Sequence, residues 1–159
     1  LAERVSNNNS IGFLFVGRGR AVKQLKADVE KKSLNNILFY DEINSNEIPA
    51  LYEQCSFGII SLDRRHKTHN IPGKFLSYLN SGLPVLAVVN KNNDMEGIIN
   101  ENKIGCVTTN HSVDVLVKLV NELMENSLND DSMKDRCREL SKDLFSTEVA
   151  VKQITNVLV

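Results

Sequence analysis

The sequence IPGKFLSYLNSGLPVLAVV at residues 71–89 combines a helix signal with a strand signal. Pro72 suits the first turn of a helix, where its missing backbone N–H costs nothing, and the pattern predicts a helix that runs to Asn80. Gly82 ends this helix. The apolar run at residues 84–89, which opens on a proline that cannot continue the helix, is typical of a strand buried on both faces of a parallel sheet.

The same alternation of apolar strands and amphipathic helices extends along the chain in both directions. Strands are predicted at residues 11–16, 36–40, 57–61, 84–89 and 104–108, and helices at residues 21–32, 48–54, 72–80, 95–100, 113–124, 132–144 and 147–158. This order predicts an α/β fold, a Rossmann-like doubly wound parallel sheet followed by C-terminal helices. A length of 159 residues favours one domain, residues 1–159.

The composition is that of an ordinary globular protein. Nineteen Lys and Arg residues nearly balance 20 Asp and Glu residues, which removes any global argument for a nucleic-acid partner or for a charged membrane surface. The longest purely apolar stretch, residues 83–89, is far shorter than the ~20 residues of a membrane-spanning helix. No Lys- or Arg-led hydrophobic leader is present. We therefore expect a cytoplasmic protein.

Cysteine and asparagine carry no predicted chemistry in this chain. Cys55, Cys106 and Cys137 are widely spaced and form no C-x-x-C pair, which argues against a zinc site or a disulfide framework. We interpret them as buried small apolar side chains in a reducing compartment, and we expect no metal site. Asparagine patches such as residues 92–93 are interpreted as a compositional habit.

Ligands of open parallel sheets bind beyond the carboxyl ends of the strands, where we expect three segments of this chain. The first is Gly17-Arg18-Gly19, whose glycines let the backbone approach a phosphate at the start of the next helix. The full dinucleotide fingerprint requires a third glycine at the position of Val22, so the motif is incomplete. A tight turn without a ligand is the alternative interpretation.

The second segment, residues 64–74, concentrates positive charge after the third strand and ends at a helix N-terminus. Its basic residues are Arg64, Arg65, Lys67, Lys74, His66 and His69. Basic side chains together with free backbone N–H groups suit a diphosphate. The alternative is a solvated basic loop, and the histidines are either phosphate neighbours or plain loop residues.

The third segment, Tyr40-Asp41-Glu42-Ile43, closes the second strand. In NAD-binding proteins an acidic residue about twenty residues after the glycine turn takes the ribose hydroxyls. Asp41 meets this spacing, so an NAD-type dinucleotide-binding domain without its catalytic partner domain stays open as an alternative. A flavodoxin-like phosphoacceptor module would need acidic residues after the first strand, where this chain carries Arg18 and Arg20.

Residues 71–87, IPGKFLSYLNSGLPVLA, resemble the (V/I)-P-S-K…E-Y-(L/M)-A-x-G-x-P-V-L-A segment of the GT-B glycosyltransferases of family 4. The resemblance is strongest to bacterial O-antigen and capsule transferases that use UDP-linked N-acetylated sugars such as N-acetyl-L-fucosamine. Residues 13–19, 37–43, 48–52, 55–61, 104–107 and 145–148 are similar to other segments of that family, in the same order and at similar spacing.

The resemblance implies the donor-binding half of a retaining transferase of bacterial surface polysaccharide synthesis, which moves a hexosyl or aminodeoxyhexosyl group. Its donor substrate is then a UDP-sugar, with no cofactor. The N-terminal acceptor-binding domain is missing, in keeping with a chain that begins at Leu1, so this part alone is expected to be inactive. A lipid-linked glycan is the implied acceptor, and the inner face of the plasma membrane is the implied location of the full protein.

The resemblance also assigns site residues. It places the donor diphosphate at Gly17, Arg18, Gly19, Pro72, Gly73 and Lys74, the base and ribose at Tyr40, Asp41, Ile43 and Ser77, and further phosphate neighbours at Arg65, Lys67 and His69. Catalytic groups that face the acceptor are expected on the missing domain.

Three of these positions depart from the family pattern. His69 and Ser77 stand where many members carry glutamates, and Gly73 replaces the usual serine. A serine hydroxyl lacks the charge-assisted acceptors of a carboxylate, a loss worth ~1.5–3 kcal/mol of donor binding.

Overall fold

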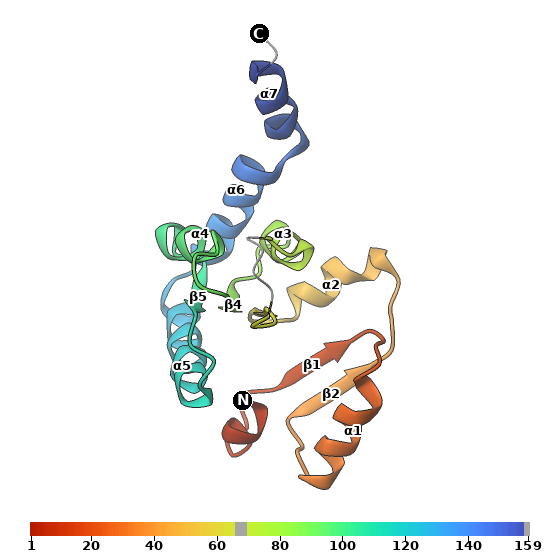
Figure 1. Ribbon diagram of the computed structural model, residues 1–159. Helices are drawn as coiled ribbons and strands as arrows, with labels where there is room; N and C mark the ends of the chain where they lie inside the picture. Colours follow the sequence, from red (N-terminus) through yellow and green to blue (C-terminus); the bar gives the residue numbers. More distant parts are fainter. Residues whose placement is uncertain (66–69, 158–159) are drawn as a thin grey trace. The chain divides into compact units, whose positions relative to one another are not determined.

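The computed structural model describes residues 1–65 and 70–157, and it divides into two compact units, Leu1–Ile48 and Pro49–Val159 (Figure 1). We describe each unit by itself, and the expectation of one domain over residues 1–159 stays a prediction. The described strands are all parallel and are flanked by helices, which confirms the α/β class.

The first unit is a two-stranded parallel sheet with one α-helix. Its elements are η1 (Ala2–Val5), β1 (Phe13–Val16), α1 (Val22–Lys31), β2 (Ile37–Tyr40) and η2 (Ser45–Glu47). Phe15 is paired with Phe39 across the sheet, and their rings stack with centroids 5.2 Å apart. The ammonium of Lys26 lies 5.9 Å from the centroid of the Phe39 ring, so α1 lies on the face that carries these rings, where Phe15 is still 45% exposed.

The opposite face of this sheet is apolar and exposed. Leu14, Val16, Leu38 and Tyr40 alternate with Phe15 and Phe39 along the strands, and Leu38 and Tyr40 are each 58% exposed. Within the first unit, β1 and β2 are therefore not buried on this face. The first unit contains one α-helix among its elements, and that helix lies on the other face.

The second unit is built on a three-stranded parallel sheet of order β3-β4-β5. Its elements are α2 (Ile48–Glu53), β3 (Gly58–Ser61), α3 (Gly73–Asn80), β4 (Val85–Val88), α4 (Met95–Asn102), β5 (Gly105–Thr108), α5 (Val113–Asn129), α6 (Met133–Phe145) and α7 (Thr147–Val157). Pro72 immediately precedes α3, and Gly82, at φ +69°, follows its end, as the sequence predicts.

The core of the second unit forms around β4, which is buried at every position. Helices α3, α4 and α6 contribute most of the other core side chains, which are Phe75, Leu79, Met95, Ile99, Cys137 and Leu140. Burial raises the pKa of the Cys137 thiol to about 12 and that of the Cys106 thiol to about 11. The interpretation of these two cysteines as buried apolar residues is confirmed, whereas Cys55 is partly exposed.

The backbones of β4 and β5 approach each other closely at Gly105. Gly105 is paired with Val85, and its φ is +154°. A Cβ atom at this position would lie 2.0 Å from the Val85 carbonyl oxygen. Only glycine fits this register.

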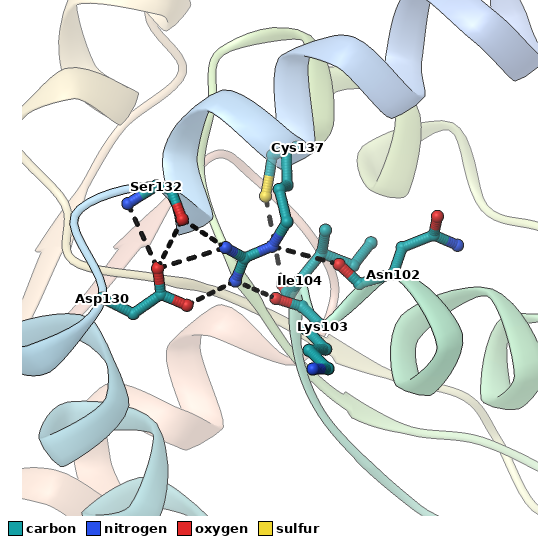
Figure 2. Close-up of polar contacts among 7 residues, drawn as sticks. Asn102, Lys103, Ile104, Asp130, Ser132 and Cys137 are labelled. Atoms are coloured by element: carbon teal, nitrogen blue, oxygen red, sulfur yellow. Dashed lines mark hydrogen bonds and ion pairs between the residues drawn. The ribbon is translucent and has the colours of Figure 1, made fainter.

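The start of α6 is tied to the end of α4 by the guanidinium of Arg136 (Figure 2). Its Nε donates to the Asn102 carbonyl at 3.2 Å, and its Nη2 donates to the Lys103 carbonyl at 2.7 Å. Two further N–H groups bind the Asp130 carboxylate at 2.5 and 3.1 Å. A cation therefore satisfies carbonyls at the negative end of the α4 dipole.

We expect the contribution of Asp130 to stability to depend on pH. Hydrogen bonds from Arg136 and Ser132 hold the pKa of Asp130 well below its usual range. A lowered folded-state pKa stabilises the fold above the unfolded pKa of about 4, and this stabilisation fades as the pH falls toward the folded value. Asp130→Asn should therefore lower Tm at pH 7, and its deficit against the parent should shrink below about pH 4.

Thermal unfolding followed by circular dichroism between pH 7 and pH 3 measures this difference. Asp135→Asn is the matched control, because Asp135 pairs with Arg138 on the exposed face of α6 at 3.0 Å. A deficit for Asp130→Asn that does not change with pH would contradict the assignment.

Candidate functional site

In the first unit, the glycine turn and the end of β2 lie side by side at the carboxyl ends of the parallel strands. The Gly17 N–H donates to the Tyr40 carbonyl at 3.1 Å, and the Val22 N–H donates to the Gly19 carbonyl at 3.2 Å where α1 begins. Tyr40 and Asp41 are exposed, and Ile43 is half-buried. The structure thus brings together two of the three segments predicted from the sequence.

The charge of the glycine turn is already paired in this structure. The Arg18 Nε lies 2.9 Å from a Glu42 carboxylate oxygen, and the two side chains are 85% and 58% exposed. An ion pair this exposed is worth little because solvent screens it. Arg18 is therefore accessible to an anion, with Glu42 as the group that competes for it.

Gly17 and Gly19 differ in backbone conformation, and only one of the two positions requires a glycine. Gly17 has φ +126°, a backbone conformation that side chains disfavour. A Cβ atom added to Gly19 would meet no atom within 4 Å, and its φ is not in the left-handed region. The fold requires glycine at Gly17, whereas at Gly19 it leaves open space next to the backbone.

In the second unit, the N-terminus of α3 follows the carboxyl end of β3 in the chain. Pro72 is extended at ψ 143°, and its carbonyl accepts from the Phe75 N–H at 2.9 Å. The N–H groups of Gly73 and Lys74 belong to the first turn, where no intrahelical carbonyl is available to them. Both residues are exposed, so the positive end of the α3 dipole faces solvent beside a lysine.

Ser77 lies one turn further along α3 and is exposed. Its hydroxyl donates to the Gly73 carbonyl at 3.1 Å, which leaves the oxygen lone pairs free to accept. Pro72, Gly73, Lys74 and Ser77 thus occupy the first turns of one helix, as the predicted site requires.

Arg65 is held by a neighbour in its own loop. Its Nε and Nη2 donate to the Asp63 carboxylate at 3.0 and 2.6 Å, and the hydrogen bond to Asp63 raises the pKa of Arg65. The predicted phosphate neighbours Lys67 and His69 lie outside the described residues.

The family model of the glycosyl transferases group 1 matches residues 1–142. The chain belongs to this family. No curated protein matches it. Family membership assigns glycosyltransferase chemistry, with a nucleotide-sugar donor and an acceptor as the substrates, on a GT-B half-domain. It favours this function over the NAD-type alternative, for which Val22 already breaks the glycine fingerprint.

Sequence reasoning missed two asparagines of this group 1 glycosyltransferase, both in the loop between β4 and α4. The Asn90 amide donates to the Asp63 carbonyl at 3.1 Å, and the Asn93 amide lies 3.5 Å from the Asn70 carbonyl. Asn93 is buried, with 4% of its surface exposed. Their position after a predicted strand, at the edge where ligands bind, was the signal that could have found them.

Among the described residues, the structure shows neither a candidate metal site nor a candidate membrane-spanning helix. No group of three or more His, Cys, Asp and Glu side chains among them is placed to hold a metal ion. In the same part of the chain, no helix combines the length and the apolar character that crossing a membrane requires.

Proposed function

We propose that this chain binds the UDP-sugar donor of a retaining family 4 glycosyltransferase. The resemblance of residues 71–87 to the O-antigen and capsule transferases supports a role in bacterial surface polysaccharide synthesis, with a lipid-linked glycan as acceptor. An N-terminal acceptor-binding domain completes the enzyme in this proposal, and the full protein works in the cytoplasm at the inner face of the plasma membrane.

The observation that carries the proposal is the N-terminus of α3, which lies inside the family match. It offers two first-turn N–H groups, the positive end of a helix dipole and the Lys74 ammonium, all exposed. These are the groups that bind phosphate oxygens.

The same groups would assist the reaction as well as binding. Transfer breaks the bond between the anomeric carbon and the β-phosphate oxygen, and negative charge develops on the departing UDP. Fixed N–H dipoles and Lys74 stabilise that charge without having to reorganise. The family resemblance also assigns Arg18 and the Gly17–Gly19 turn to the diphosphate, and Tyr40, Asp41, Ile43 and Ser77 to the base and ribose.

An NMR shift-perturbation titration with UDP, GDP and NADH in parallel tests the proposal. This method detects millimolar dissociation constants, to which half of a binding cleft is limited. We expect UDP to shift resonances at residues 17–20, 40–43 and 72–77. Shifts with NADH in place of UDP would support the NAD-type dinucleotide-binding alternative. An absence of chemical-shift changes on addition of UDP would contradict the proposed donor.

Two variants locate the site within this titration. Lys74→Ala should weaken UDP binding about tenfold, the value of a charge-assisted hydrogen bond. Gly19→Val should abolish it, because the new side chain occupies the open space through which phosphate approaches the backbone. Lys118→Ala on the exposed face of α5 and Gly12→Val before β1, where an added Cβ also meets nothing, are matched controls. Parent-like binding by both site variants would show that the site is misplaced.

A further inference from the structure

The loop between β4 and α4 contacts the chain at two points between β3 and α3. Asn90 donates to the carbonyl of Asp63, just after β3, and Asn93 reaches the carbonyl of Asn70, two residues before Pro72. These contacts join residues that are 27 and 23 positions apart in the chain. We call Asn90 and Asn93 the asparagine brace.

Asn93 is itself firmly anchored. Its side-chain oxygen accepts from the Met95 N–H at 3.1 Å, and its carbonyl accepts from the Glu96 N–H at 3.0 Å. Met95 is fully buried in the core of the second unit. The acceptor of the amide is therefore committed to the start of α4, and the NH₂ group is left for the Asn70 carbonyl.

The other arm of the brace leads to a basic side chain. Asn90 binds the backbone of Asp63, and the carboxylate of Asp63 binds the guanidinium and the backbone N–H of Arg65. One arm thus ends at the entry to α3, and the other ends at Arg65.

We propose that the asparagine brace positions the donor site. In this inference, Asn93 fixes the backbone at Asn70, so that the N–H groups of Gly73 and Lys74 present themselves to the diphosphate, while Asn90 fixes Asp63 and with it Arg65. The inference rests on the proposed UDP-sugar function. Asn90 and Asn93 are positioning residues, because they act through the backbone of the donor site.

Asn93→Asp separates positioning from simple stabilisation. An aspartate keeps an oxygen for the Met95 N–H but loses the NH₂ donor, and it sets a carboxylate against the Asn70 carbonyl. In an NMR titration with UDP, we expect the dissociation constant to rise about tenfold. UDP-induced shifts at residues 72–77 should be lost while the resonances of β5 and α5 in the same unit keep their parent positions, a local effect that destabilisation of the second unit would not produce.

Two further variants complete the experiment. Asn102→Asp is the control, since its NH₂ group binds the Ile98 carbonyl within α4 at 2.9 Å and touches no part of the brace. It should bind UDP within twofold of the parent. Asn90→Asp removes the NH₂ donor to the Asp63 carbonyl and should also weaken UDP binding, which keeps the inference testable if Asn93→Asp does not fold.

The outcomes distinguish the two levels of the proposal. If the parent binds UDP and both brace variants bind it within twofold, the brace has no positioning role and the donor function stands. If the parent itself does not respond to UDP, the donor function fails, and the inference fails with it.

Discussion

Gly105→Ala is expected to destabilise the second unit by at least about 3 kcal/mol. The new methyl group would lie 2.0 Å from the Val85 carbonyl oxygen, and the residue would have to keep φ +154°. Neither strand can retreat at low cost, because β4 is buried along its whole length and Ile104, which precedes Gly105, is fully buried. The clash is with backbone, which no side-chain rotation relieves.

Urea denaturation followed by circular dichroism measures the loss. Gly97→Ala is the matched control, because Gly97 lies in α4 and an added Cβ would meet only the Glu101 carboxylate, at 3.6 Å. Alanine favours a helix over glycine by up to about 1 kcal/mol, so the control should be neutral or stabilising. A free energy of unfolding for Gly105→Ala within 1 kcal/mol of the parent value would refute the close approach of β4 and β5.

Gly58→Ala should cost about 1–3 kcal/mol through a clash with the ring of Tyr78. A Cβ atom on Gly58 would lie 2.5 Å from two ring carbons of Tyr78. The ring is not free to move away, since it contacts Tyr52 edge-on at a centroid distance of 5.0 Å and is buried enough to raise the pKa of Tyr78 to about 12. Gly58 thus sets how closely α3 approaches β3.

A double-mutant cycle tests this cause. In a Tyr78→Ala background the space beside Gly58 is open, so Gly58→Ala should cost less than about 0.5 kcal/mol there. An equal loss of stability in both backgrounds would mean that the ring of Tyr78 is not what excludes a side chain at Gly58.

The order and type of the helices and strands were predictable because their apolar patterns are local. The end of α5 was not, since the apolar period stops near Met124 while the helix continues to Asn129 through mostly exposed residues, Leu128 among them. The short helix η2 was missed although its signal was present. Asn44 and Glu47 form a capping box, an N-x-x-E pattern that marks a helix start.

Burial was less predictable than secondary structure. The apolar runs of β1 and β4 look alike in the sequence, yet β4 is fully buried and three of the four β1 residues are exposed. An apolar run shows that both faces of a strand carry apolar side chains, whose burial is favourable. It contains no information on which helix covers each face.

The residues of the candidate site were also predictable only in part. The glycine turn, the end of β2 and the start of α3 follow from their place after strands, and the structure brings the first two into contact through Gly17 and Tyr40. The interpretation of the asparagine patch as compositional is wrong for Asn93, which is buried and hydrogen-bonded. Its partner Asn70 is distant in sequence, so no local pattern identified the contact.

The Arg136 contacts have a consequence for the order in which the chain is made. The carbonyls that Arg136 satisfies are 33 and 34 residues upstream, and α6 also supplies Cys137 and Leu140 to the core around β4. While the ribosome is still adding α5, α4 lacks its partner at the C-terminal end and the core lacks one wall. Domains fold as units during synthesis, so the second unit closes only after α6 has emerged. In a nascent chain stalled before Arg136, β4 and α3 would therefore lack the cover that α6 provides. We expect such a chain to bind chaperones.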